Sequence, residues 1–181
     1  MLKFALLILL FNLFVASSSA QVVSTFAGNG TPGNANGQGT AAQFNRPLAI
    51  AIDSSGNLFI TDHSNDQIRK IDPSANVTTI SGNVAGFQDG PVGVARFNRP
   101  WGITINHSGS LIIGDNLNDR VRKIQNNTVT TIAGSGNTGN QVGPALTATF
   151  HNPYGICIDD TGNVYIVDRY NQQIKKLTPG G

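Results

Sequence analysis

The stretch FNRPWGITINHSGSLIIGDNLNDRVRKI, residues 97–124, decides the fold because the chain contains three copies of it. The other copies are FNRPLAIAIDSSGNLFITDHSNDQIRKI, residues 44–71, and FHNPYGICIDDTGNVYIVDRYNQQIKKL, residues 150–177. The copies follow one another at intervals of 53 residues, an interval kept by Phe44, Phe97 and Phe150 and by Pro47, Pro100 and Pro153. Repetition at a fixed period of this size is typical of propellers and of arrays of stacked units.

Each copy predicts short antiparallel strands joined by tight turns. In the first copy, residues 48–52 form an apolar run, and further strand-like runs follow at 58–62 and 67–71. Residues 77–80 add a fourth, more polar strand. Four antiparallel strands per repeat make a propeller blade. We therefore expect an all-β propeller with repeats at about 44–82, 97–134 and 150–177.

The third repeat lacks its fourth strand, whereas the segment before the first repeat resembles one. Residues 22–28, VVSTFAG, match residues 77–82 and 129–134 and predict a stray outer strand. This order is that of propellers in which both ends of the chain build one blade. Three blades fall short of a closed ring, for which four is the usual minimum. Two explanations stay open: a fragment of a longer product, or a homodimer in which two chains complete a six-bladed ring.

The N-terminus has the pattern of a secretory signal peptide over residues 1–20. Lys3 precedes an apolar run from Phe4 to Ala16, and small residues at Ser18 and Ala20 predict a cut before Gln21. A membrane anchor is the alternative, but the run is shorter than the roughly 20 apolar residues that span a bilayer. We expect a secreted, extracellular chain, without membrane insertion after cleavage, whose residues 21–181 form one propeller domain.

The charge balance and the single cysteine each restrict the interpretation of the chain. Without Lys3, 11 basic residues face 10 acidic ones, all of them Asp, and this balance predicts no nucleic-acid partner. Cys157 is the single cysteine and aligns with Ala51 and Thr104 within the first strand of a repeat. We expect a buried thiol there, with a reactive or intermolecular thiol as the alternative.

Three motifs give the repeats a family resemblance. They are the P-x-x-I opening (Pro47/Ile50, Pro100/Ile103, Pro153/Ile156), the hairpin G-N-L/V-Y/F-I, and D-x-x-N-x-x-I/V-R/K-K-I/L at 62–71, 115–124 and 168–177. These units resemble the NHL repeat over nearly all of residues 22–177. The resemblance implies blades of a six-bladed propeller of the extracellular type. NHL proteins bind proteins, bind RNA or cleave small substrates, so the fold alone does not name a function.

Positions shared by all three copies are expected to build the blade. Each second strand ends in an aspartate that is followed three residues later by an asparagine: Asp62, Asp115 and Asp168 with Asn65, Asn118 and Asn171. Such side chains bond readily to loop backbone, and the alternative is a ring of carboxylates around a metal. The basic pairs at 69–70, 122–123 and 175–176 are expected on outer strands, paired with Asp or with solvent.

Positions that differ between copies are the candidates for function. Trp101 and Tyr154 follow the repeat proline, where the first copy has Leu48, while His63, Asn116 and Arg169 follow the repeat aspartate, and His151 lies on the same rim. We expect these six residues, Trp101, Tyr154, His63, His151, Asn116 and Arg169, to form a binding pocket near the propeller axis. Ordinary packing and solvation of the rim is the alternative.

The sequence therefore favours a secreted module that binds a protein or glycan ligand. A metal-dependent lyase or lactonase-like enzyme that needs a complete ring is the alternative, as is a fragment without independent function. The three histidines occupy unrelated repeat positions rather than one per blade, and no catalytic motif is present. We expect no catalytic residues, no metal and no cofactor.

Four N-x-S/T sequons are candidate glycosylation sites: Asn29, Asn76, Asn106 and Asn126. The last three lie in turns that strand alternation places on the rim opposite Trp101 and His63. Glycans there would leave the predicted binding rim free.

Overall fold

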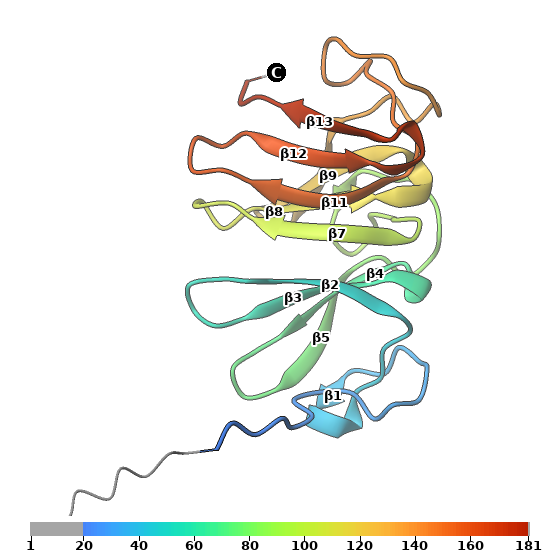
Figure 1. Cartoon of the computed structure of the whole chain (residues 1–181). Helices are drawn as coiled ribbons and strands as arrows, with labels where there is room; N and C mark the ends of the chain where they lie inside the picture. The colour runs from blue at the N-terminus through green and yellow to red at the C-terminus, as the bar shows by residue number, and fades with distance from the viewer. Residues whose placement is uncertain (1–19, 181) are drawn as a thin grey trace, which may run out of the picture.

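The computed structural model describes residues 20–180, and within them the chain is built from thirteen strands in three antiparallel sheets (Figure 1). The all-β, propeller-type fold predicted from the repeats is confirmed. The predicted signal peptide lies outside the described residues except for Ala20. No helix among the described residues is long and apolar enough to cross a membrane.

Blade 1 contains the first repeat. Its strands run outward from the propeller axis in the order β2 (Pro47–Ile52), β3 (Leu58–Asp62), β4 (Gln67–Ile71) and β5 (Asn76–Ser81). The predicted bounds of the second and third strands agree with the structure, because polar turns flank both runs. A two-residue strand, β1 (Gly37–Gln38), pairs with β5 and forms the outer edge of the sheet.

Blades 2 and 3 repeat this plan. Blade 2 has β7 (Pro100–Ile105), β8 (Leu111–Asp115), β9 (Arg120–Gln125) and β10 (Thr128–Ala133), with β6 (Gly90–Pro91) at its outer edge. Blade 3 has β11 (Pro153–Ile158), β12 (Val164–Asp168) and β13 (Gln173–Leu177). The edge strands β1 and β6 were not predicted, because they are two-residue strands within glycine-rich interblade loops.

Four short 3-10 helices connect these strands. The first, η1 (Gly39–Ala41), lies in the loop before blade 1. The others follow the second strand of each blade: η2 (His63–Asn65), η3 (Asn116–Asn118) and η4 (Arg169–Asn171). The recurring turns place the residue after each repeat aspartate on the same rim.

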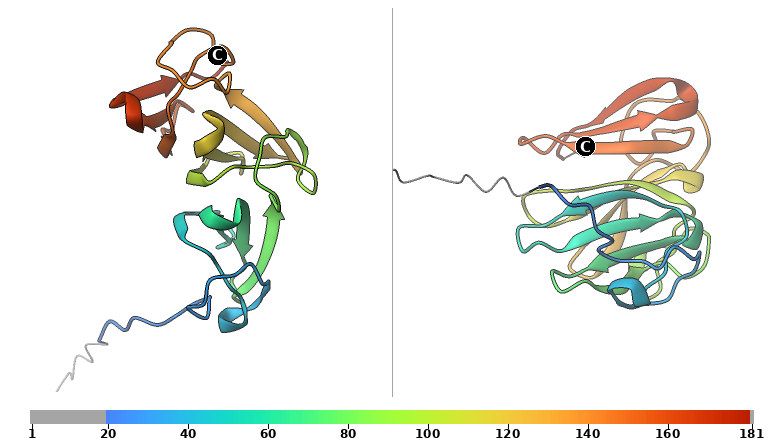
Figure 2. Two further views of the ribbon diagram at one scale, coloured as in Figure 1. Left: turned by 90° about the vertical axis from the view of Figure 1, so that its right-hand side faces the viewer. Right: turned by 60° about the horizontal axis from the view of Figure 1, so that its bottom comes forward.

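The blades stack in chain order, with blade 1 and blade 3 at the two ends (Figures 1 and 2). We call the side of a blade that packs on the blade before it the leading face, and the opposite side the trailing face. Ile103 on the leading face of blade 2 is 5% exposed, whereas Ile50, at the same repeat position in blade 1, is 60% exposed. Val121 on the trailing face of blade 2 is fully buried, whereas its counterpart Ile174 in blade 3 is 68% exposed. The leading face of blade 1 and the trailing face of blade 3 therefore each leave apolar side chains exposed.

Packing between blades accounts for two of the three apolar clusters of the core. The third lies in blade 1, where Ala42 and the preceding loop pack against Ile60, Ile71 and Val77. One apolar cluster joins the trailing face of blade 1 to the leading face of blade 2, and a second joins blade 2 to blade 3 in the same way. Burying each isoleucine or leucine side chain at such a joint contributes about 2 kcal/mol. The blades therefore depend on their neighbours for stability, as in other repeat architectures.

Cys157 corrects one expectation. Its thiol is exposed rather than buried, because it lies on the innermost strand of blade 3, in the region of the open trailing face. Its counterpart Ala51 packs against the cluster between blades 1 and 2. Ala51 and Thr104, the counterparts in the blades that have a following neighbour, are partly buried.

Residues 22–28, expected as a stray outer strand, belong to no strand among the described residues. Val22 and Val23 in this segment are largely exposed to solvent. The match to residues 77–82 and 129–134 predicted the strand, but the segment pairs with no strand within the described residues.

Candidate functional site

The shared aspartates brace the rim of each blade. In blade 1, Asp62 accepts hydrogen bonds from the backbone N–H of Asn45 (2.7 Å) and the side chain of Asn65 (2.8 Å), and it pairs with Arg69 at 2.7 Å. Asp115 and Asp168 make the equivalent contacts in blades 2 and 3. The three repeats thus hold the turns after their second strands in one geometry.

The basic partners are more buried than expected. Arg69 and Arg122 are completely buried, and Lys175 nearly so, although the repeat pattern suggested an outer, solvated strand. Each reaches across its blade to its aspartate and to a backbone carbonyl at the start of the repeat: Gln43, Arg96 or Thr149. Sequence reasoning recognised the pairing but missed the burial, because alternation along a strand does not show that an interblade loop covers it.

A row of stacked side chains crosses the rim from blade 1 to blade 3. His63 meets the indole of Trp101 edge to face, with 4.9 Å between ring centroids. Trp101 stacks on Tyr154 at 3.7 Å and an interplanar angle of 23°. On Tyr154 the Arg169 guanidinium carbon lies 4.4 Å from the ring centroid, and the guanidinium donates a hydrogen bond to the phenol oxygen. Four of the six candidate residues therefore form one continuous stack.

A cavity of about 460 Å³ opens beside this row. Among the residues that line it are five of the six predicted positions: His63, Trp101, Asn116, Tyr154 and Arg169. The structure adds residues that sequence comparison did not single out, namely Arg46, Arg99, Leu117, Asn152 and Tyr170. We call this set the rim site.

His151 does not line the cavity. It packs beside Tyr170 with 4.8 Å between ring centroids, and its backbone N–H is bonded to the Asp168 carboxylate. The sequence placed His151 on the correct rim, but its position one residue after Phe150 directs it to the flank of the site.

The residue before each repeat proline also lines the rim site, although the comparison of the three repeats did not single it out. Arg46, Arg99 and Asn152 all have left-handed backbone, with φ of 56°, 51° and 61°. Such φ values are uncommon outside glycine. At the joints between blades, the carboxylates of Asp66 and Asp119 accept the backbone N–H of Arg99 and Asn152, each at 2.7 Å. The N-R-P and H-N-P triplets could have pointed to this shared conformation.

His63 is a neutral imidazole near neutral pH. Its side chain is buried, and desolvation lowers its pKa, aided by the positive charges of Arg46 and Arg99 and opposed mainly by the carbonyl of Pro100. Nδ1 lies 3.3 Å from that carbonyl oxygen, so the tautomer with a proton on Nδ1 donates a bond there. The imidazole therefore fills and orders the site rather than carrying its charge.

Among residues 20–180, no group of three or more His, Cys, Asp or Glu side chains is arranged to hold a metal ion. His107 lies in the exposed turn between β7 and β8, at the end of β7 opposite to Trp101. Asn106 shares that turn, and Asn76 and Asn126 border the turns between the third and fourth strands. Their use as glycosylation sites remains a prediction.

Comparisons with known proteins agree with the repeat geometry. A family model described as "NHL repeat" matches residues 150–177. NHL repeat-containing protein 2 of Bos taurus is 32% identical over 170 residues, which are 84% of this chain and 23% of that protein. The chain belongs to the NHL-repeat family. It spans less than a quarter of the length of that NHL relative.

Solved structures show the same NHL-type propeller fold. A Bacteroides thetaiotaomicron protein of unknown function is 29% identical with a TM-score of 0.64, over 67% of this chain and 32% of that one. An auxiliary nutrient binding protein from the same organism is 24% identical with a TM-score of 0.63, over 70% of this chain and 36% of that one. The NHL propeller is an architecture suited to an interaction module.

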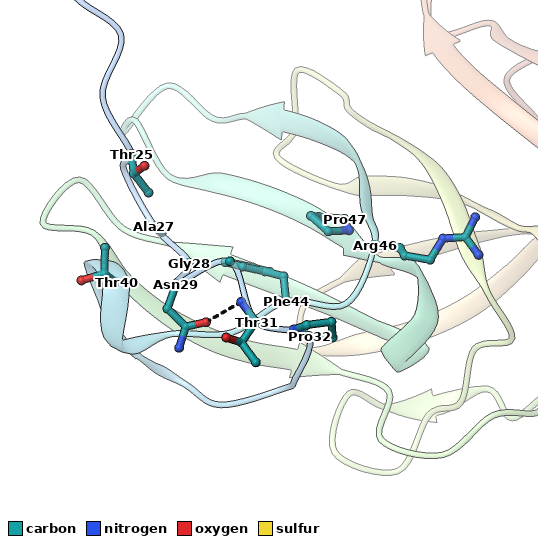
Figure 3. A pocket seen from close by; sticks show the side chains of 11 residues that line it. Thr25, Ala27, Gly28, Asn29, Thr31, Pro32, Thr40, Phe44, Arg46 and Pro47 are labelled. Carbon is teal, nitrogen blue, oxygen red and sulfur yellow. Dashed lines mark hydrogen bonds between the residues drawn. The ribbon is translucent and has the colours of Figure 1, made fainter.

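A second and larger cavity, of about 780 Å³, lies at the leading face of blade 1 (Figure 3). Gly28, Gly30, Phe44 and Pro47 are among the residues that line it. At the equivalent place in blade 3, the turn of blade 2 fills the space: a Cβ added to Gly134 would lie 2.5 Å from the carbonyl oxygen of Asp119. The cavity is therefore the place that the turn of a preceding blade would occupy.

Proposed function

We propose that this chain is a secreted NHL-type propeller module that binds a protein or glycan partner through the rim site. One observation carries the proposal: the positions at which the three repeats differ come together in one cavity. Residues that serve the blade recur in every copy, whereas Trp101, Tyr154 and Arg169 occur once each and meet there. The N-terminal sequence supports secretion.

The composition of the rim site supports binding over simple packing. Trp, Tyr and Arg are the residue types that most often dominate protein interfaces. Tyr170 and Leu117 are about half exposed at the border of the cavity and offer apolar surface to a partner. His63 and Asn116 lie buried beneath and hold the aromatic row in place.

Arrays of extracellular-type peptides and glycans, probed with the purified chain, test this function. We expect one or more ligands to bind the natural chain and to lose at least about tenfold in affinity with Trp101→Ala/Tyr154→Ala. Val84→Ala is the matched control, since Val84 is exposed in an interblade loop away from the rim site. Equal binding by the double variant, with its fold intact by circular dichroism, would contradict the proposal.

We also infer that a second copy of the chain covers the two open faces and completes the ring. The leading face of blade 1 carries Ile50 where blade 2 carries Ile103, and the trailing face of blade 3 carries Ile174 where blade 2 carries Val121. The two exposed faces therefore carry the same kinds of apolar residue that pack between blades inside the chain, and they can pack in the same way between two chains. Gln172, which takes the place of Asp66 and Asp119, has an amide oxygen that can accept the backbone N–H of Arg46.

Light scattering of the purified chain tests this assembly. We expect twice the chain mass, and half that value for Ile50→Lys or Ile174→Lys, because either lysine would be buried without a partner charge. Val84→Lys is the control and should leave the dimer intact. A natural chain that is a stable monomer would refute the pairing without affecting the rim site.

A further inference from the structure

We propose that the rim site recognises carboxylates on an acidic segment of a protein partner. The inference rests on the proposed binding function and names the chemistry that the site selects. Three arginines, Arg46, Arg99 and Arg169, line the cavity, and no acidic residue lines it with them. They come from three different blades, so the assembled fold brings them together.

Two of these arginines are available to a ligand. Arg46 and Arg99 are exposed, and within residues 20–180 neither side chain makes an ion pair or a hydrogen bond. Both act electrostatically on His63, so their positive charges lie near the same point of the rim. By contrast, Arg69 and Arg122 are buried and paired with aspartates. Three described guanidinium groups make no ion pair or side-chain hydrogen bond. Those of Arg46 and Arg99 lie together at the rim site, and that of Arg96 lies in an interblade loop.

The acidic groups near the arginines are already engaged. Asp66 acts electrostatically on His63, and its carboxylate accepts the backbone N–H of Arg99 at 2.7 Å. Asp62 and Asp115 are buried and paired. Three guanidinium groups therefore face a single nearby unpaired carboxylate, that of Asp66, and the surplus of positive charge attracts an anion from outside.

The aromatic row disfavours a sugar or a nucleobase as the main ligand. Sugars and bases bind proteins by laying a ring against an open aromatic face. In this site Tyr154 covers one face of Trp101, His63 packs against the indole at an interplanar angle of 77°, and Arg169 lies over Tyr154. The row therefore offers edges and polar tips rather than a free face.

Carboxylates suit the arginines and the apolar border of the rim site. A guanidinium is planar and presents two parallel N–H groups that match the two oxygens of a carboxylate. A polyphosphate chain is recognised by many basic residues, but the formal net charge here is only +2. An acidic peptide segment needs only a few arginines and some apolar border, which Leu117 and Tyr170 supply. Such exposed ion pairs speed association and set specificity.

Fluorescence of the full chain tests this assignment, because Trp101 is its only tryptophan and stacks within the site. The probes are a glutamate-rich peptide, a lysine-rich peptide of equal length, a uronate oligosaccharide and a single-stranded oligonucleotide. We expect saturable binding of the glutamate-rich peptide alone, weakened as salt rises from about 50 to 300 mM.

Arg46→Gln/Arg99→Gln should weaken that binding by at least about tenfold. Arg96→Gln is the matched control, since Arg96 is exposed in an interblade loop outside the rim site. Tighter binding of the uronate would refute a protein segment as the source of the carboxylates. Tighter binding of the oligonucleotide, or equal binding by the double variant, would overturn the carboxylate assignment. If the glutamate-rich peptide fails while an array ligand still depends on Trp101 and Tyr154, this inference falls and the proposed function stands.

Discussion

Arg122 offers a quantitative test of how the blades are held together. It is completely buried and donates hydrogen bonds to the carboxylate of Asp115 and to the carbonyls of Gln88 and Arg96. Its Nε and Nη2 groups also donate to the carboxylate of Asp89. It therefore ties the second strand of blade 2 to the interblade loop that precedes it. Replacing it by methionine keeps similar apolar volume but leaves Asp115 buried without a counter-ion.

We expect Arg122→Met to lower the free energy of unfolding by about 3–5 kcal/mol, the usual cost of breaking a buried ion pair. Arg122→Lys should cost less, about 1–3 kcal/mol, because it loses chiefly the bonds to the loop. Blade 3 shows that lysine is tolerated: Lys175 contacts Asp168 and the carbonyl of Thr149, each at 2.7 Å.

The effect should also depend on pH in a defined direction. Burial raises the pKa of Asp115 to about 6, and the Arg122 guanidinium opposes that rise. A carboxyl whose pKa is raised on folding stabilises the protein most below its unfolded pKa, and this stability is lost as pH rises through the folded pKa. Removing the guanidinium raises the folded pKa further, so the loss continues to higher pH. Arg122→Met should therefore be more damaging at pH 8 than at pH 5.

Urea unfolding followed by circular dichroism at pH 5, 7 and 8 measures these differences. Lys123→Met, on the same strand and only partly buried, is the control and should change stability by less than about 0.5 kcal/mol. The reasoning fails if Arg122→Met is no worse than Lys123→Met, or if Arg122→Lys is as damaging as Arg122→Met.

Three further predictions follow from differences between repeats. Lys175→Arg should raise the free energy of unfolding by about 1 kcal/mol, because an arginine can fill the cavity of about 270 Å³ beside Lys175 and bond to the interblade loop; an unchanged urea midpoint would contradict this. Gly134→Ala should lower the free energy of unfolding by about 2–3 kcal/mol, since Gly134 has a φ of +95° and a backbone carbonyl occupies the place of the added Cβ. Gly109→Ala is the control: Gly109 has a similar φ of +78° but open space around it, so this change should cost about 1 kcal/mol in the same assay. Hydrogen bonds, led by that from the Asn163 side chain, lower the pKa of Asp159, so the stabilisation by this carboxylate is present above about pH 4 and is lost as pH falls through the folded pKa. Asp159→Asn should therefore make the free energy of unfolding depend less on pH in the acid range. The same acid dependence in the variant and the natural chain would argue against this.

Much of the fold could be predicted because three copies of one unit supply an internal alignment. The strands at 58–62 and 67–71 agree with the structure because each is an apolar run bounded by Asp, Asn or Gly turns. Of the candidate site, five of six positions line one cavity, because residues at equal repeat positions in neighbouring blades face the same axis.

Other features could not be predicted from the pattern of single residues. Arg46 and Arg99 each precede the proline that recurs in all three repeats, but the sequence does not show that both approach His63. That approach depends on the angle between neighbouring blades. The burial of Arg69 and Arg122 depends on the interblade loops before their repeats, which accept their hydrogen bonds at the carbonyls of Ala35 and Gln88. Cys157 is exposed because no described blade follows blade 3.

The sequence by itself determined the blade: its strands, its turns and the aspartate that braces each rim, all of which depend on contacts within a repeat of 53 residues. Only the tertiary structure decided which residues of different blades meet. Packing one blade on the next buries Ile103, stacks Trp101 on Tyr154 and gathers three arginines beside them. These contacts join residues about 53 positions apart, so they follow from the geometry of the joint between blades and not from any local pattern.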